Sequence, residues 1–589
     1  MEIAFVLSLL AIAMVLFARE TLPVDIVTLL VLLALIGSGI LTPNEAFAGF
    51  GSDIIIILAS VFIISGALRE SGVVDWLGDK LGKIARGGEI SLLVYMMGSV
   101  SGLSAFMNNT TVTALMLAPV TGMARKHKWC PSKFLMPLAF ASILGGTCTL
   151  IGTSTNVAVS GYLASVGLAP LGFFELTPVG LVIVVVGTLY MIFIGRRLLP
   201  ATTVSEDLTG DYGLREYLSE IVIKEKSPLV GQALRDSDLG KMDFRVLKVL
   251  RNARAMVPRA SLVLQTGDVL LVNGPVESLM KVRETGGIDI KPDIKFTDRE
   301  LKADDLEILE LLVTPQSGLR GRRIEDLDLP ARLGVAVLAI NRHGESLREK
   351  IKAVRLETGD LLLVQGPRES MESLRNSPDF ATFGEQNPAP HRDAKGLLVL
   401  GFLATGVFLG ATGLVPLSAG LLGAAVAAVL TRCMPMHKVY TSVEWRLLVL
   451  IAGMTAFGLA MEKTGAAAWV ANLIVGGLEP LGALFILAGF VVLTVILTQP
   501  MSNAAAALVV LPIALSTAET LGLDGRSFAI AITFAASVSL IAPFEPSSLL
   551  VYGPGKYRFM DFLKVGGPLT LLLLVIIVTL VPIIWPLTH

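Results

Sequence analysis

The sequence contains few charged residues, and those that it contains nearly cancel. Only 16% of its 589 residues are charged, and 48 basic residues stand against 49 acidic ones, which gives a formal net charge of −1 at pH 7. A chain without an excess of positive charge lacks the electrostatic field that binds polynucleotides. The composition therefore argues against a nucleic-acid partner.

Cysteine and histidine are also scarce. The three cysteines, Cys130, Cys148 and Cys433, have no CxxC spacing, and the five histidines form no HxxxH or HxxE pattern. These absences argue against a disulfide framework and against a zinc site. The sequence also shows no nucleophile paired with a base and no ATP-binding motif, so it does not predict an enzyme.

Apolar residues, by contrast, are abundant. The chain is 53% hydrophobic and has a mean hydropathy of +0.71, which is too apolar for a soluble protein of this size. Residues 1–199 and 394–589 contain several runs near the ~20 residues that a helix needs to cross a bilayer. We therefore predict a polytopic α-helical membrane protein whose partner is the lipid bilayer. The first run, "IAFVLSLLAIAMVLFA", lacks a basic n-region and is expected to stay as a span.

The segment between these two blocks is rich in charge and contains an internal repeat. "LQTGDVLLVNGP", residues 264–275, is similar to "LETGDLLLVQGP", residues 356–367. A repeat of this length predicts two tandem soluble α+β domains, residues 200–295 and 296–393, inserted between a first membrane repeat, 1–199, and a second, 394–589.

The repeated segment resembles the C-terminal domain of the regulators of potassium conductance, also called the TrkA C-terminal domain, on its "TGDxLLVxGP" signature. The resemblance implies a cytoplasmic module that pairs as a dimer and often binds a small regulator such as a nucleotide. A dimerisation unit without a ligand is the open alternative, because no GxGxxG or GKS motif is present. The basic clusters "ARKHK", 124–128, and "GRR", 195–197, also favour a cytoplasmic location for residues 200–393 of a protein in the plasma (inner) membrane.

The two membrane blocks are similar to each other. Gly72 and Trp76 of the first correspond to Gly465 and Trp469 of the second, 393 positions later in both cases. An offset of 394 (502 − 108) places "NNTT", from Asn108, opposite "SNAA", from Ser502, in the second block. We therefore predict inverted repeats with re-entrant hairpins, whose broken segments meet at a transport site.

The residue types at these breaks suit a small anion together with a hard cation. Asn amides and Ser or Thr hydroxyls donate hydrogen bonds to an anion, while their oxygens and backbone carbonyls coordinate sodium. Because the segments carry no fixed basic residue, co-bound cations would supply the positive charge that an anion needs.

The same segments resemble the divalent anion:sodium symporters, whose signature is a Ser-Asn-Thr motif at the tip of a hairpin in each half. The matching residues are Asn108-Asn109-Thr110 and Ser502-Asn503-Ala504, each preceded by a hydroxyl residue, Ser104 or Thr498. The following loops, residues 152–156 and 544–548, resemble a Gly-Thr-Pro-Pro-Asn loop, and "VYGPGKYRFMDF" is similar to sulfate-type or citrate-like permeases.

This resemblance implies an elevator mechanism in a homodimer that carries sodium ions and a small divalent anion. It assigns one sodium site to Ser104, Asn108, Asn109 and Gly152, and a second to Thr498, Ser502, Asn503 and Phe544. It assigns substrate contacts to Asn108, Asn109, Thr110, Thr153, Ser154, Asn156, Ser502, Asn503, Glu545, Pro546 and Ser547.

Three departures from the family pattern affect the choice of substrate. Asn108 replaces a serine, Ala504 removes a threonine hydroxyl, and Glu545 places a carboxylate at membrane depth, where charge is costly. Glu545 could bind a cation, couple transport to protons, or pair with Lys556 or Arg558. Sulfate is favoured over a dicarboxylate or citrate. The alternatives are a proton-coupled transporter that uses Glu545 and a regulated ion channel, although no TVGYG-like filter is present.

Overall fold

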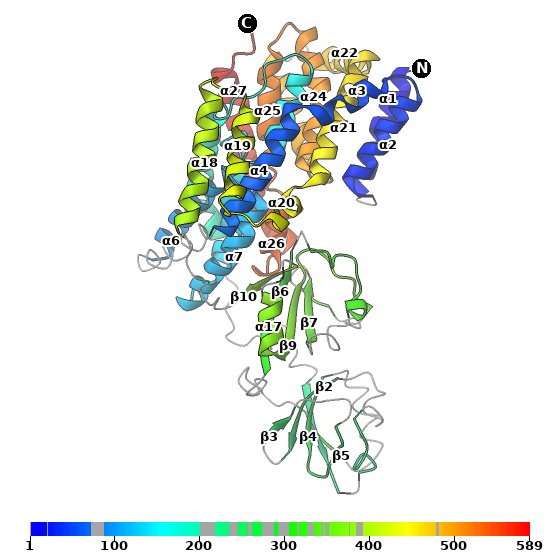
Figure 1. Ribbon diagram of the computed structural model, residues 1–589, viewed down its shortest axis with the longest axis vertical. Coiled ribbons are helices and arrows are strands. Elements are labelled where there is room, and N and C mark those ends of the chain that lie inside the picture. The colour runs from blue at the N-terminus through cyan, green and yellow to red at the C-terminus, as the bar shows by residue number, and fades with distance from the viewer. Residues whose placement is uncertain are drawn as a thin grey trace. The chain divides into compact units, whose positions relative to one another are not determined.

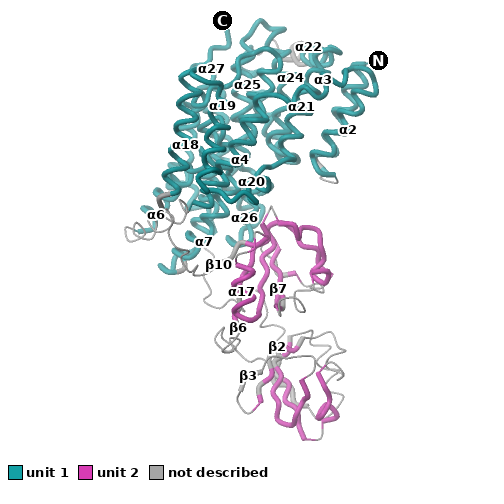
Figure 2. The backbone as a smooth tube through the Cα atoms, in the orientation of Figure 1, with its two compact units in different colours: residues 1–202, 385–589 teal, residues 203–384 magenta. Residues whose placement is uncertain are grey.

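The computed structural model divides the chain into two compact units. The first unit combines residues 1–202 with 385–589, and the second contains residues 203–384 (Figure 2). The structure describes residues 2–19, 22–71, 88–200, 393–478 and 482–588 of the first unit, and residues 218–225, 227–234, 245–251, 254–256, 262–273, 288–292, 306–314, 317–327, 335–342, 345–347, 353–375, 377 and 379–383 of the second. Gly72 and Trp76, which helped to define the repeat, lie outside these residues.

Among its described residues, the regular secondary structure of the first unit is entirely helical. Its first half contains α1 (Glu2–Arg19), α2 (Val24–Gly37), α3 (Pro43–Phe47), η1 (Ala48–Gly51), α4 (Asp53–Glu70), α6 (Glu89–Ser104), α7 (Asn109–Lys126), α8 (Ser132–Gly146), α9 (Ser154–Ser165), α10 (Thr177–Tyr190), η3 (Met191–Gly195) and α11 (Arg196–Leu198). Its second half contains α18 (Asp393–Ala411), α19 (Leu417–Leu430), α20 (Met436–Ser442), α21 (Trp445–Lys463), α22 (Ala466–Leu478), α23 (Ala483–Leu497), α24 (Asn503–Thr520), α25 (Gly525–Ser537), α26 (Pro546–Tyr552) and α27 (Phe559–Ile584).

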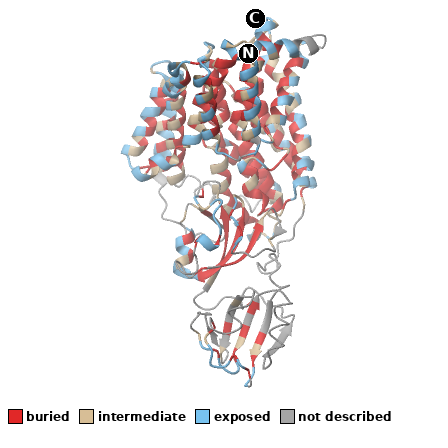
Figure 3. Ribbon diagram, turned by 90° about the vertical axis from the view of Figure 1, so that its right-hand side faces the viewer, coloured by how far each residue is buried: buried red, intermediate tan, exposed pale blue. Residues whose placement is uncertain are grey.

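The helices have the length and the surface of membrane spans. Among the described residues, five helical segments are long and apolar enough to cross a bilayer: 43–70, 177–198, 445–463, 503–520 and 559–584. Buried residues lie mainly where helices face one another (Figure 3). Large apolar side chains also point outward, and in α27 Leu571, Val575 and Ile583 are 60 to 72% exposed. An apolar interior combined with an apolar exterior indicates lipid contact.

The helices of the two halves follow one another in the same order at nearly constant spacing. α4 and α21 begin 392 residues apart (445 − 53), α7 and α24 begin 394 apart (503 − 109), and α8 and α25 begin 393 apart (525 − 132). Equivalent short helices lie at opposite ends of the unit, as α3 and α20 do in Figure 1.

Helices of each half pack against helices of the other half as well as within their own half. α2 packs on α21, and the equivalent α19 packs on α4. In the same way α9 packs on α24, and α26 packs on α7. The halves are therefore interlocked, and each of these four helix contacts has an equivalent formed by the exchanged elements.

Two ion pairs occupy equivalent positions of the two halves, with the acidic and basic residues interchanged. Glu45 of α3 pairs with Lys463 at the end of α21. Lys438 of α20 pairs with Glu70 at the end of α4, with 2.6 Å between Nζ and Oε2. The positions are equivalent, because 438 − 45 and 463 − 70 both equal 393. One geometry thus recurs with acid and base interchanged.

The second unit contains two five-stranded antiparallel sheets of the same topology. The first consists of β1 (Leu218–Ile223), β2 (Arg245–Arg251), β3 (Arg254–Met256), β4 (Val269–Asn273) and β5 (Ile288–Pro292), in the order β3-β2-β4-β1-β5. The second consists of β6 (Leu306–Val313), β7 (Ala336–Arg342), β8 (Glu345–Ser346), β9 (Leu361–Pro367) and β10 (Phe380–Phe383), in the equivalent order β8-β7-β9-β6-β10. α17 (Arg368–Arg375) buries Met371 and Leu374 in the core of the second sheet.

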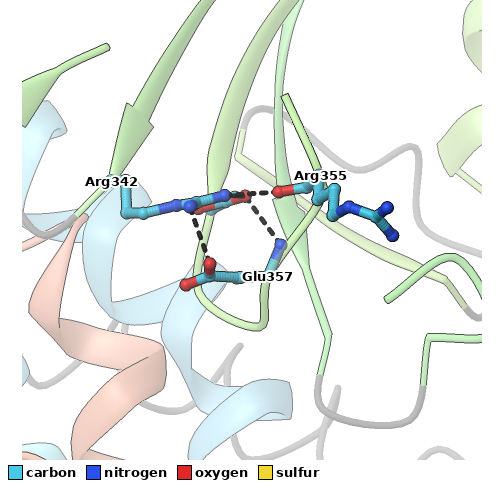
Figure 4. A network of polar contacts seen from close by, with 4 residues as sticks. Arg342, Arg355 and Glu357 are labelled. Carbon is cyan, nitrogen blue, oxygen red and sulfur yellow. Dashed lines mark hydrogen bonds and ion pairs between the residues drawn. The ribbon is translucent and has the colours of Figure 1, made fainter. Parts of the chain in front are cut away.

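The same arrangement of side chains in the two sheets explains the repeated Thr-Gly-Asp segment. In the second sheet Asp360 is fully buried and accepts two hydrogen bonds from Arg342, at 2.7 and 2.8 Å, and one from the Glu357 backbone N–H at 2.8 Å. Arg342 also donates to the Arg355 carbonyl, as Figure 4 shows. The aspartate thereby joins the turn before β9 to the end of β7.

The first sheet repeats this network. Asp268 is fully buried and accepts from Arg251 at 2.7 Å through both carboxylate oxygens, and from the Gln265 N–H at 2.9 Å. Hydrogen bonding to Asp268 raises the pKa of the Arg251 guanidinium, which favours its charged form. A buried carboxylate needs such a bidentate partner, and this requirement accounts for the motif without a ligand.

Candidate functional site

The first hairpin consists of α6 and α7, joined by the four residues 105–108. Asn108 directly precedes α7, and its Oδ1 accepts a hydrogen bond from the Thr110 backbone N–H at 2.9 Å, which satisfies a donor at the helix start. Ser104, the last residue of α6, donates to Asn109 Oδ1 at 2.7 Å. Both Ser104 and Asn109 are buried. The predicted tip residues therefore lie together.

The loop after α8 closes over this tip. Gly146 ends α8, and a Cβ placed on it would lie 2.5 Å from Asn109 Oδ1 and 2.6 Å from Thr153 Cγ2. The Thr149 hydroxyl donates to the Ala105 carbonyl in the hairpin. Gly152 in turn lies directly against the Gly146 carbonyl. The absence of side chains at Gly146 and Gly152 allows this approach.

Asn156 holds the loop in place. Its side-chain amide donates to the carbonyls of Gly146 at 3.0 Å and Thr149 at 2.8 Å. Thr153 caps α9 by accepting from the Asn156 backbone N–H at 3.3 Å, and its hydroxyl donates to Asn156 Oδ1 at 3.0 Å. Asn156 is thus buried and extensively hydrogen-bonded within the protein, while Ser154 begins α9 beside it and is partly exposed.

The second hairpin consists of α23 and α24, joined by residues 498–502. Ser502 is the N-cap of α24, with its hydroxyl accepting from the Ala505 N–H at 3.4 Å. Thr498, the equivalent of Ser104, donates instead to the Val495 carbonyl at 2.8 Å. Ser502 is exposed and Asn503 is partly buried. This tip is therefore more open than the first.

Gln499 links the second tip to the loop that follows α25. Its side-chain amide donates to Ser539 Oγ at 2.6 Å. Gln499 is equivalent to Ala105 (499 − 105 = 394), whose carbonyl accepts from Thr149 in the first half. At this position each hairpin is thus hydrogen-bonded to the loop that follows the next helix, through a backbone carbonyl in the first half and a side-chain amide in the second. The sequence analysis missed Gln499 because Ala105, its counterpart, contributes only backbone.

Glu545 is the N-cap of α26. Its Oε2 accepts from the backbone N–H groups of Ser547 at 2.7 Å and Ser548 at 3.3 Å, and its Oε1 accepts from the Ser547 hydroxyl at 3.2 Å. Glu545 is equivalent to Thr153 (545 − 153 = 392), which caps α9. Capping is an interpretation that the sequence analysis did not consider.

The remaining residues of this loop differ in accessibility. The Phe544 side chain is 59% exposed and Pro546 is exposed, whereas Ser547 and Ser548 are fully buried. The Ser548 hydroxyl has no hydrogen-bond partner within the described residues.

The four polar segments converge through the exchanged packing of the halves. α9, which follows the first loop, packs on α24 of the second hairpin, and α26, which follows the second loop, packs on α7 of the first. Ser537 at the end of α25 donates to Asn156 Oδ1 at 3.5 Å. The sequence-predicted residues therefore come together as two tip-and-loop clusters in one helical body.

A further acidic residue contacts the first tip. Glu444 is the N-cap residue of α21, and its Oε1 accepts from Asn108 Nδ2 at 3.3 Å. The sequence analysis did not identify Glu444, because it lies 336 residues from Asn108 and outside every motif that the two halves share.

Comparison with known proteins identifies the class to which this helical body belongs. The family model described as citrate transporter (CitMHS) matches residues 14–535. The chain belongs to the citrate transporter family. As a member of this family it is an integral membrane protein and a secondary transporter, not an enzyme.

Relatives of this citrate transporter family member extend over its whole length. It is 34% identical to an uncharacterized transporter of Synechocystis sp. across 97% of this chain and 95% of that protein. It is 32% identical to the uncharacterized transporter YfbS of Escherichia coli, across 99% of each chain. It is also 26% identical to sodium/sulfate cotransporter 1 of Chlamydomonas reinhardtii, across 60% of this chain and 42% of that protein. The first two relatives cover nearly the whole chain, so their similarity includes residues 203–384 as well as the helical unit.

Proposed function

We propose that this protein is a sodium-coupled symporter of a small divalent anion. The observation that carries the proposal is the first tip cluster, where Ser104, Asn109 and the Gly146–Gly152 backbone bring hydroxyl, amide and carbonyl oxygens together. Such hard neutral oxygens are ligands that suit sodium. Among the described residues no Lys or Arg hydrogen-bonds to either tip, so a bound cation would supply the charge that holds the anion.

The second tip supports a second sodium site. Thr498, Ser502 and Asn503 occupy the positions equivalent to Ser104, Asn108 and Asn109. The carbonyl at Phe544 would complete this site as the carbonyl at Gly152 completes the first. Sulfate is favoured as the anion, supported by the relative named sodium/sulfate cotransporter 1 and by the "GPGKYRF" segment. A dicarboxylate and citrate are the other candidates.

We also propose that the hairpins and their loops move as one body past a fixed body, as an elevator. The equal spacing of elements in the two halves, and the position of α3 and α20 at opposite ends, support an inverted repeat. Inverted repeats provide two equivalent access routes to one site at mid-membrane. A homodimer in the plasma membrane, with residues 200–393 in the cytoplasm, completes the proposal.

Uptake into proteoliposomes tests the coupling and the substrate together. Purified protein is reconstituted, and an inward sodium gradient is imposed with labelled sulfate, succinate or citrate outside. We expect uptake of one of these anions to collapse when potassium replaces sodium or when monensin dissipates the gradient. Uptake of all three anions that is independent of sodium would contradict symport, and dependence on a proton gradient instead would favour proton coupling.

A further inference from the structure

Two carboxylates lie beside the hairpins, and only one of them is used to cap its own helix. Glu545 caps α26 through both oxygens. Glu444 occupies the N-cap position of α21 but makes no side-chain hydrogen bond to that helix. Its side chain instead accepts a hydrogen bond from Asn108, at the tip of the first hairpin.

The orientation of Asn108 makes this contact specific. Its Oδ1 accepts from the Thr110 N–H, and a backbone N–H can only donate. The amide nitrogen must therefore point the other way, toward Glu444 Oε1. An asparagine provides this donor, whereas a serine, which the symporter motif has here, is too short to serve both partners.

The contact has no equivalent in the other half. The position that corresponds to Glu444 is Ser52 (444 − 52 = 392), which is the N-cap residue of α4 and makes no side-chain hydrogen bond to that helix. The Ser52 hydroxyl donates locally to the Gly49 carbonyl at 2.7 Å. A carboxyl group is thus present at the first tip, and a hydroxyl group takes its place at the equivalent position of the other half.

In the proposed elevator, Glu444 would belong to the fixed body that the first hairpin moves against. Its helix α21 packs on α2 and α3 as well as on α9 and α24, and the Lys463–Glu45 pair fastens its other end to α3. Asn108 is at the tip of the α6–α7 hairpin. In an elevator, a hydrogen bond between these two bodies forms in one state and breaks in the other.

We propose that Glu444 makes anion binding conditional on sodium. A fixed carboxylate next to the tip repels a divalent anion held by Asn108, Asn109 and Thr110, and a cation bound at the Ser104–Asn109 cluster offsets that repulsion. Binding of the two ions is therefore coupled, and the coupling is reciprocal. This inference depends on the proposed symport and names the residue that enforces it.

The test compares the anion KM at limiting and at saturating sodium, since the ratio of the two values measures the coupling. Glu444→Gln keeps an oxygen that accepts from Asn108 but removes the charge. We expect the ratio to fall about tenfold, which corresponds to about 1.4 kcal/mol of lost coupling, mainly through a lower KM at limiting sodium. Glu519→Gln, which removes an exposed carboxylate near the end of α24, is the matched control and should keep the wild-type ratio.

The outcomes separate this inference from the proposed function. A wild-type protein without sodium-dependent uptake contradicts the symport itself. Sodium-dependent wild-type uptake with an unchanged ratio in Glu444→Gln overturns the role of Glu444, even if Glu444→Ala loses activity, because a purely structural contact survives in the glutamine variant. If Glu444→Gln does not fold, Glu444→Asp withdraws the charge from Asn108 by one methylene. The aspartate variant should then lower the ratio partially, and a wild-type ratio overturns the inference.

Discussion

A methyl group at Gly146 would displace the side chain that the first cluster depends on. The added Cβ would lie 2.5 Å from Asn109 Oδ1, well inside van der Waals contact, and overpacking of this kind costs about 1 to 3 kcal/mol. We expect Gly146→Ala to reduce sodium-dependent uptake at least tenfold while the protein still folds. Thermal unfolding in detergent and uptake in proteoliposomes measure the two effects separately.

Gly98→Ala is the control for this substitution. Gly98 lies within α6, and a Cβ there would meet no atom within 4 Å. Alanine also favours a helix over glycine by up to about 1 kcal/mol, so this variant should keep full uptake with equal or higher stability. Wild-type sodium affinity in Gly146→Ala would show that Asn109 is not a sodium ligand.

Single residues also mark the limit of what the sequence could predict. The motif alignment assigned Asn108, Asn109, Ser502 and Asn503 to the tips of two hairpins, and the structure has them where α7 and α24 begin. It could not assign a role to Glu545, because capping depends on where α26 begins. The equivalence of Glu545 with Thr153 was visible in the offset, but the common function of the two residues required the helix boundaries.

At the scale of helices, the reversed ion pairs predict that charge exchange is tolerated. Glu45→Lys or Lys463→Glu alone should lower stability, whereas the double exchange should restore it, since Lys438 and Glu70 already have that polarity in the same geometry. The pairs are part-exposed, so each is expected to contribute below about 1 kcal/mol. A double-mutant cycle on thermal unfolding measures the coupling, and additive effects of the two single changes would contradict a direct interaction.

The packing of helices against the opposite half was not predictable from the sequence. Hydropathy and the 393-residue offset identify equivalent elements, but equivalence does not say which elements touch. α2 could pack on α4 of its own half or on α21 of the other, and both arrangements bury the same apolar faces. The Asn108–Glu444 contact follows from this exchange, which is why sequence analysis found one partner and missed the other.

At the scale of the whole molecule, the two units predict that transport and its regulation are separable. The chain leaves the helical unit near residue 202 and returns near residue 385. Replacing residues 205–385 with a flexible Gly/Ser linker of about 20 residues should leave sodium-dependent uptake within about threefold of wild type. It should abolish any response of uptake to added nucleotides, measured in the same proteoliposomes.

Either of two results would contradict a regulatory insertion. A response to nucleotides that persists in the shortened protein would place the regulator in the helical unit. Loss of the folded transporter, seen as early elution or aggregation in size-exclusion chromatography, would make the insertion a structural requirement.

The repeated "TGD" segment predicted two tandem domains, and the structure has two sheets of identical strand order. Their resemblance to the regulators of potassium conductance stays a prediction.

Because helices of the first half pack on helices of the second, the first half cannot complete its packing until the second half has been synthesised. Glu45 and Lys463 are 418 residues apart, so at a translation rate of about 5 to 20 residues per second the first emerges from the ribosome roughly 20 to 80 s before its partner. During that interval α2 and α4 are in the bilayer without α21 and α19 to cover them. The insertion alone accounts for more than a third of the delay. Biogenesis of this protein therefore requires the nascent first half to remain in the membrane, unpaired and protected, until the second half arrives.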